Sequence, residues 1–125
     1  MTLLPRRLDY DQNKSHNHYR LRAGTALADA IYTVESSGVL YRTDPANGRW
    51  KALGKPAFEN TRFMFAAGGK LYTIERNGSL YRVDPANGSW KRVGKSGAWK
   101  ATIAGTALAD AIYTVESSGA LYRTD

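Results

Sequence analysis

The chain of 125 residues contains no cysteine. This absence excludes a disulfide framework and any metal site built on thiolates, and it favours a reducing compartment. The N-terminal segment lacks the apolar core of a secretion signal, and no apolar run is long enough to span a membrane. We therefore expect no membrane span, and these absences together favour the cytoplasm.

Helical periodicity and the common catalytic motifs are also missing. No window of helical length shows a 3.6-residue apolar period. Hydrolase, phosphate-loop and zinc-peptidase signatures do not occur. The only histidines, His16 and His18, lie in a polar loop, and the sequence points to no third ligand for a metal beside them. We predict a non-catalytic protein that needs no cofactor or metal.

What the sequence does contain is an internal repeat. Residues 23–44 and 104–125 are the same 22-residue stretch, with Val39 replaced by Ala120 as the single difference. A weaker third copy lies between them and ends at Asp84, about midway between Asp44 and Asp125. The repeating unit is therefore about 40 residues long, and such a period is typical of propellers and other repeat architectures.

The middle copy divides into four short segments that favour β-structure. Tyr, Val, Ile, Thr and Trp are frequent in them, and Gly-Gly, Asn-Gly and Asp-Pro-Ala-Asn-Gly turns separate them. The predicted strands are 62–67, 71–75, 80–83 and 90–93. Four antiparallel strands in each unit of about 40 residues predict an all-β protein built from β-propeller blades.

The chain is predicted to be a single partial propeller with three blade equivalents. Residues 1–17 form a leading outer strand (near 6–12) and a loop, 18–57 and 58–98 form two complete blades, and 99–125 form three strands of another. Propellers usually close with about four to eight blades. We therefore expect two copies to form a six-bladed ring, in which the N-terminal strand of one chain completes the last blade of its partner. A fragment of a longer repeat protein, or an engineered repeat, is the alternative.

The net charge of +7 would attract anionic surfaces, but no block of like charge exceeds two or three residues. Nucleic acid is therefore an unlikely partner. Arginine recurs at one strand position in every copy, the first being Arg42. With a two-residue turn at Ser37 and Gly38, Glu35 would lie diagonal to Arg42 on one sheet face. We interpret these arginines as structural partners of the glutamates.

Residues 58–65 (FENTRFMF), 69–74 (GKLYTI) and 78–82 (GSLYR) resemble blades of the tachylectin-like and tectonin-like β-propeller lectins. Those blades carry an aromatic residue followed by Lys/Arg-Phe-Leu-Phe, then Gly-x-Leu-Tyr-x-Val and a second Leu-Tyr-Lys/Arg. The resemblance implies non-catalytic recognition of N-acetylated sugars or similar glycans in pockets between neighbouring blades. The present unit is shorter than a tachylectin blade, and only the middle copy has the aromatic run.

Four residues are the candidates for sugar contact. Trp99 and Phe58 could stack on the apolar face of a pyranose, while Arg62 and Asn60 could donate hydrogen bonds to hydroxyl or acetamido groups. The competing interpretation is that the two aromatic rings only pack between blades. The predicted function is carbohydrate binding by a self-associated propeller. The alternatives are a scaffold that binds a protein or peptide, a designed or fragmentary repeat without a natural ligand, and charge-driven binding of polyanions.

Overall fold

The computed structural model describes residues 20–125, which form strands and turns in three antiparallel sheets. The first sheet has the order β1-β2-β3-β4, with β1 (Leu21–Leu27), β2 (Ala30–Glu35), β3 (Leu40–Thr43) and β4 (Trp50–Leu53). The second has the order β5-β6-β7-β8, with β5 (Thr61–Ala67), β6 (Lys70–Glu75), β7 (Leu80–Val83) and β8 (Trp90–Val93). The third has the order β11-β10-β9, with β9 (Thr102–Leu108), β10 (Ala111–Glu116) and β11 (Leu121–Thr124).

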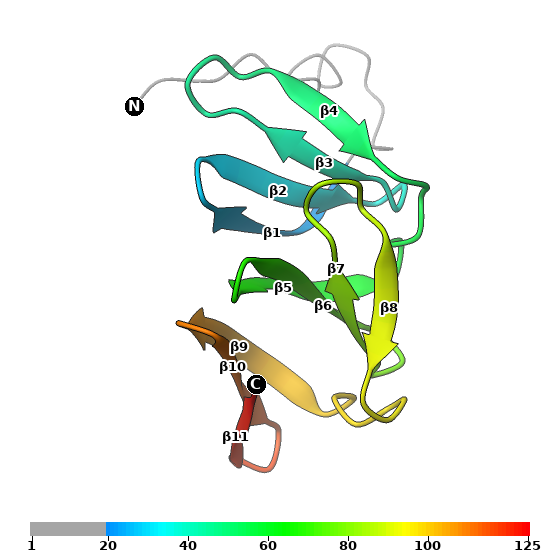
Figure 1. Cartoon of the computed structure of the whole chain (residues 1–125). Helices are drawn as coiled ribbons and strands as arrows, with labels where there is room; N and C mark the ends of the chain where they lie inside the picture. Colours follow the sequence, from blue (N-terminus) through cyan, green and yellow to red (C-terminus); the bar gives the residue numbers. More distant parts are fainter. Residues whose placement is uncertain (1–19) are drawn as a thin grey trace.

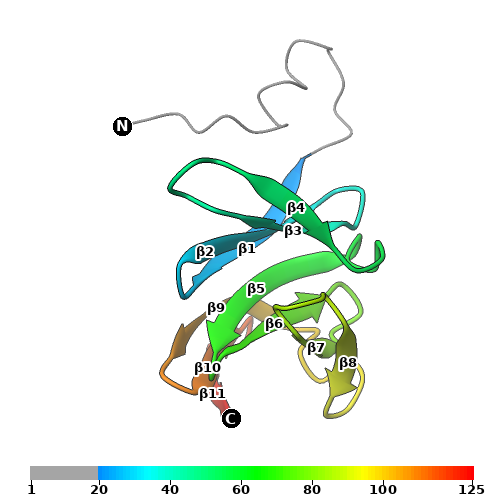
Figure 2. The ribbon, with the colours of Figure 1, turned by 45° about the horizontal axis from the view of Figure 1, so that its top comes forward.

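The sheets are stacked in chain order, from the first at the top of Figure 1 to the third at the bottom. β1 contacts β5, and β5 contacts β9, so the first strands of the three sheets follow one another through the stack. Figure 2 shows the same order from another side, with β5 between β1 and β9. This arrangement is a partial β-propeller of three blades, which confirms the fold predicted from the repeat.

The four strands predicted for the middle copy are confirmed, with β7 and β8 at the predicted bounds. The third sheet has three strands among the described residues. The strand predicted near residues 6–12 lies outside those residues, as do His16 and His18. No helix in residues 20–125 is long and apolar enough to cross a membrane.

Both faces of a sheet carry apolar side chains, because a blade packs against a neighbour on each side. We call the face toward the following sheet the forward face and the face toward the preceding sheet the rear face. The first interface packs Leu40 of the forward face of the first sheet with Met64 and Leu71 of the rear face of the second. The second interface packs forward-face Ile74 with rear-face Ile112. These two apolar layers form the core.

The loop between β2 and β3 is one residue longer than predicted. Glu35 donates its N–H to the carbonyl of Val39 (3.2 Å), and Gly38 donates to the carbonyl of Glu35 (2.8 Å), which encloses a three-residue loop. The register then places Arg42 opposite Tyr32, so Glu35 lies on the other face of the sheet. The predicted diagonal pair of Glu35 and Arg42 is therefore wrong, and the same register separates the equivalent residues in the other two sheets.

Candidate binding pockets between the sheets

The four residues predicted to contact sugar do not form one site. Phe58 is completely buried in the first interface, where its N–H donates to the carbonyl of Gly38 (3.0 Å). A ring with no exposed face cannot stack on a sugar, so the prediction for Phe58 is corrected to a packing role. Trp99 occupies the equivalent position at the second interface, with its N–H on the carbonyl of Gly78 (2.9 Å), but its side chain is only half-buried.

Trp99 lines a pocket of about 300 Å³ at the third sheet. The ring lies against the loop after β8, since a Cβ added to Gly94 would be 3.0 Å from its Cη2 atom. Turn bonds fix the segment, including the N–H of Thr102 to the carbonyl of Trp99 (3.2 Å). The other lining residues come from β10, β11 and the loop before β9, namely Ala98, Thr114, Glu116, Tyr122, Arg123 and Thr124. An indole, a phenol ring, a carboxylate and hydroxyl groups thus surround one hollow.

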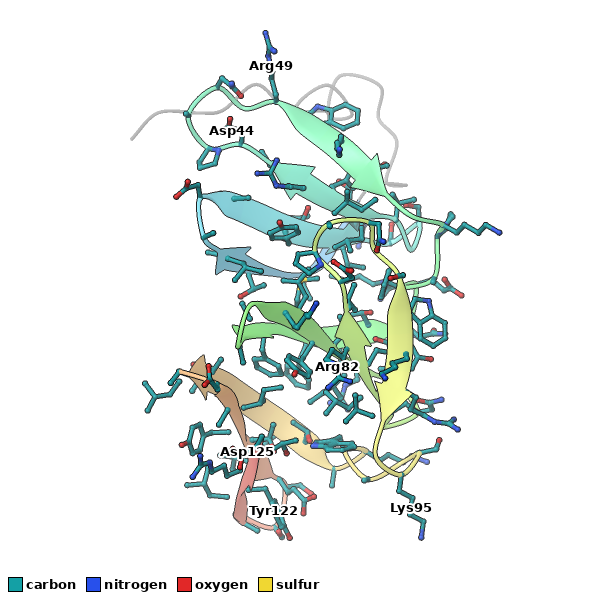
Figure 3. All side chains as sticks on the ribbon, in the orientation of Figure 1. Asp44, Arg49, Arg82, Lys95, Tyr122 and Asp125 are labelled. Carbon is teal, nitrogen blue, oxygen red and sulfur yellow. The ribbon has the colours of Figure 1, made fainter. Side chains whose placement is uncertain are left out.

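Tyr122 is the aromatic lining residue that sequence reasoning missed. Its two sequence equivalents each contact a tryptophan: Tyr41 meets Trp50 edge-on with ring centroids 5.5 Å apart, and Tyr81 stacks on Trp90 at 4.2 Å. Tyr122 has no such ring contact within residues 20–125 and is 50% exposed. Figure 3 shows it at the end of the stack farthest from Asp44. The near-identical sequences of the copies do not reveal this difference, because the exposure of the tyrosine ring depends on the residues that pack against it.

A second pocket, of about 480 Å³, lies where β1 and β5 begin. It is lined by Arg20, Leu21, Arg22, Ser36, Thr61, Arg62, Phe63 and Arg76. Backbone bonds fix its rim: Ser36 donates to the carbonyl of Arg20 (2.7 Å), and Arg76 donates to the carbonyl of Asn60 (2.8 Å). Among the described residues, four arginines and no acidic residue line this pocket, so its chemistry suits an anion.

Arg62 and Asn60 do not line the Trp99 pocket. The guanidinium of Arg62 donates to the carbonyls of Thr102 (3.0 Å) and Lys100 (3.4 Å), and its Cζ lies 5.0 Å from the centroid of the Phe63 ring. Two of its five N–H donors are thereby engaged in joining the second sheet to the third. Asn60 contributes its backbone carbonyl to the rim of the arginine pocket and is not among the lining residues.

The wall of the arginine pocket rests on a buried carboxyl group. The hydroxyl of Thr61 donates to Oε2 of Glu75 (2.7 Å), and Glu75 is 3% exposed. Burial raises the pKa of Glu75, and the nearby Glu59 carboxylate adds to that rise, although the hydrogen bond from Thr61 opposes it. Glu75 therefore holds the pocket wall through its hydrogen bond with Thr61.

No known protein family matches the sequence, and neither does any curated protein. Among solved structures, YCF48 from Cyanidioschyzon merolae superposes with a TM-score of 0.63 at 20% identity, covering 86% of this chain and 37% of YCF48. PorZ, a surface component of the type-IX secretion system of Porphyromonas gingivalis, superposes with a TM-score of 0.54 at 15% identity, covering 85% of this chain and 16% of PorZ. Both neighbours are β-propeller proteins. At these identities the likeness shows the fold alone, and this chain spans less than half the length of either neighbour.

Proposed function

We propose that the protein is a non-catalytic carbohydrate-binding propeller module, with its sugar site in the pocket of Trp99. The observation that carries the proposal is a half-buried indole beside the half-exposed ring of Tyr122, with Glu116 and Thr114 on the same hollow. Aromatic faces cover the apolar face of a pyranose, and carboxylates and hydroxyls bond its hydroxyl groups. The resemblance to lectin blades supports N-acetylated sugars as the first ligands to test.

A glycan array followed by calorimetry with N-acetylglucosamine oligomers tests the sugar site. Trp99→Ala is expected to abolish binding while the circular dichroism spectrum stays that of the parent protein. Trp90→Ala is the matched control, because Trp90 is a similarly exposed indole (44%) that lies on β8 and does not line this pocket. Binding retained by Trp99→Ala, or lost equally in both variants, would contradict the assignment.

The arginine pocket supports a second candidate, which is binding of an anionic ligand. Arg22 and Arg76 are exposed at its rim, and neither has its guanidinium in a hydrogen bond among those described, whereas Arg62 does. Exposed guanidinium groups can pair with carboxylate, sulfate or phosphate oxygens. A sulfated oligosaccharide such as a heparin fragment is therefore the probe of choice.

Salt and two variants separate this candidate from the first. Heparin-fragment binding at the arginine pocket should weaken steeply between low and moderate salt, and Arg22→Ala combined with Arg76→Ala should remove most of it. Replacing Lys55 and Lys91 by alanine removes the same charge from exposed positions outside the pocket and should change binding little. Equal losses in the two double variants would show that only net charge matters. If neither sugars nor anions bind, the scaffold for a protein or peptide becomes the better interpretation.

A further inference from the structure

The third sheet exposes the side chains that its near-identical copy buries. Leu40 of the first sheet is 0% exposed, whereas the equivalent Leu121 is 67% exposed. Leu27 is half-buried against the first interface, whereas the equivalent Leu108 is 67% exposed. The first copy thus shows what an identical forward face packs against when it is covered. Its cover consists of β4, the loop that carries Phe58, and the rear face of the second sheet.

Three equivalent glycines also show that, in the described part of the chain, the third sheet lacks the cover present on the first two. Gly38, Gly78 and Gly119 have φ angles of 87°, 84° and 89°. A Cβ on Gly38 would lie 2.7 Å from the Glu59 side chain, and one on Gly78 would lie 2.5 Å from the backbone N of Lys100. A Cβ on Gly119 would meet no atom of residues 20–125 within 4 Å. The first two glycines lie against the loop that enters the next sheet, whereas Gly119 has a similar φ and no described loop against it.

The fourth strands of the first two sheets also show what the edge of β11 lacks. Leu40 pairs with Leu53 of β4, and Leu80 pairs with Val93 of β8. Trp50 and Trp90 at the starts of those strands contact the tyrosines of β3 and β7. The edge of β11 presents the same leucine and tyrosine without these partners among the described residues. A strand of the pattern Trp-x-x-Leu/Val would cover them. Its tryptophan would lie against Tyr122, so the Trp99 pocket proposed for sugar is open only while this edge is free.

Side-chain size shows which kind of sheet fits the open face. Phe65 of the second forward face is large, and its ring meets a small residue, since a Cβ on Gly105 would be 2.9 Å from its Cζ. At the equivalent positions of the first interface the sizes are reversed, with Thr25 on the forward face and Met64 on the rear face. The third forward face carries Thr106, the equivalent of Thr25. The small side chain of Thr106 therefore leaves room for a large apolar residue on the rear face of the next sheet, such as Met64 in the first interface.

We propose that the forward face of the third sheet is a docking surface for a partner sheet built like the second sheet. That partner brings a Trp-x-x-Leu/Val strand to the edge of β11 and an aromatic loop residue to Gly119. It also brings a methionine-sized side chain to Thr106. The first interface supplies the template for all three contacts, because its forward face has the same sequence.

A second copy of this chain fits the surface less well through its own first sheet. The rear face of that sheet carries Gly24 at the position of Met64. Among the described residues, a Cβ there would meet only atoms of Tyr32 and Thr33 of the same sheet. Closing two chains into a six-bladed ring would set Thr106 against Gly24. Two small residues facing each other leave unfilled volume, which makes packing at that junction less favourable.

The test extends the full chain after Asp125 with a second copy of residues 45–98. This segment follows Asp44 naturally, and both copies of the repeat read Tyr-Arg-Thr-Asp at the junction. The expected result is a higher melting temperature and amide exchange in β11 that is slower by about tenfold or more. The matched control carries Met64→Gly in the appended copy only, and it should lose most of the gain.

Three results would overturn the proposal. The first is exchange in β11 that does not slow in the extended chain. The second is an equal gain for the extension with Met64→Gly, which would show that size matching is irrelevant. The third is a parent chain that is dimeric by light scattering and already protected at β11, because a second copy would then occupy the surface.

Discussion

Residues 23–44 and 104–125 are almost the same peptide in two different surroundings. Both form the same strands in the same register, with Tyr32 opposite Arg42 in one and Tyr113 opposite Arg123 in the other. Their burial nevertheless differs on the forward face, because within residues 20–125 a sheet covers this face of the first copy and none covers it in the second copy. Local sequence determines strands and turns, whereas burial depends on the neighbouring sheet. Equivalent substitutions in the two copies therefore measure the neighbour alone.

The largest expected effect comes from leucine at the third strand. Leu40→Ala removes a side chain that is 0% exposed in the first interface, and it should lower the free energy of unfolding by about 2–5 kcal/mol. Leu121→Ala, in the same sequence context but 67% exposed, should change it by no more than about 0.5 kcal/mol. Urea denaturation of both variants measures the difference. Similar losses would mean that Leu121 is covered in solution.

The equivalent glycines should differ by a smaller amount. Alanine at Gly78 or Gly119 suffers the same strain of a positive φ, about 1–2 kcal/mol. Gly78→Ala must also displace the backbone of Lys100, which adds about 1–3 kcal/mol. Thermal and urea unfolding should therefore rank Gly78→Ala as clearly less stable than Gly119→Ala. Equal stability of the two variants would show that the backbone of the loop before β9 shifts at no measurable cost.

The strands were predictable because their signals are local. β7 and β8 have the predicted bounds, since Asn77-Gly78, Asn87-Gly88 and Gly94 delimit two short segments rich in aromatic and β-branched residues. The hairpin loop was miscounted by one residue, because Ser36-Ser37-Gly38 can close either a two-residue or a three-residue loop. That single residue transfers Glu35 to the other face from Arg42. The sequence shows no strong preference between the two loop lengths, and the backbone hydrogen bonds of Glu35 fix the three-residue loop.

The candidate site was predictable only in part, for a related reason. Ala57-Phe58 and Ala98-Trp99 are the same motif at the same point of the repeat, so both aromatic residues were expected to bind sugar. Phe58 is buried under Leu53 and the first interface, whereas Trp99 borders the uncovered β11. The arginine pocket was missed because its four arginines come from three separate segments of the chain. Only the stacking of sheets brings them together.

The buried carboxyl group of Glu75 should make the stability of the protein depend on pH. Burial raises the pKa of Glu75 in the folded state above its ordinary value near 4.5. The folded protein therefore holds this proton more tightly than the unfolded chain, so stability falls as the pH rises from 4.5 through the folded pKa. Glu75→Gln keeps a partner for Thr61 and should flatten that part of the stability curve. Melting temperatures from pH 4 to 8 measure it, and Glu116→Gln at the equivalent, more exposed position controls for the loss of one charge.

The smallest expected effect lies in the turn that both copies share. Ala28 and Ala109 have φ angles of 53° and 56°, a region that favours glycine, and the middle copy has Gly68 there with a φ of 56°. Ala28→Gly and Ala109→Gly should each relieve about 1 kcal/mol of strain, reduced by the greater freedom of glycine in the unfolded chain. Because both residues are exposed and the strain is local, the two variants should gain the same few tenths of a kcal/mol. A gain in only one copy would mean that the neighbouring sheet influences even this turn, and the separation of local structure from burial would then fail.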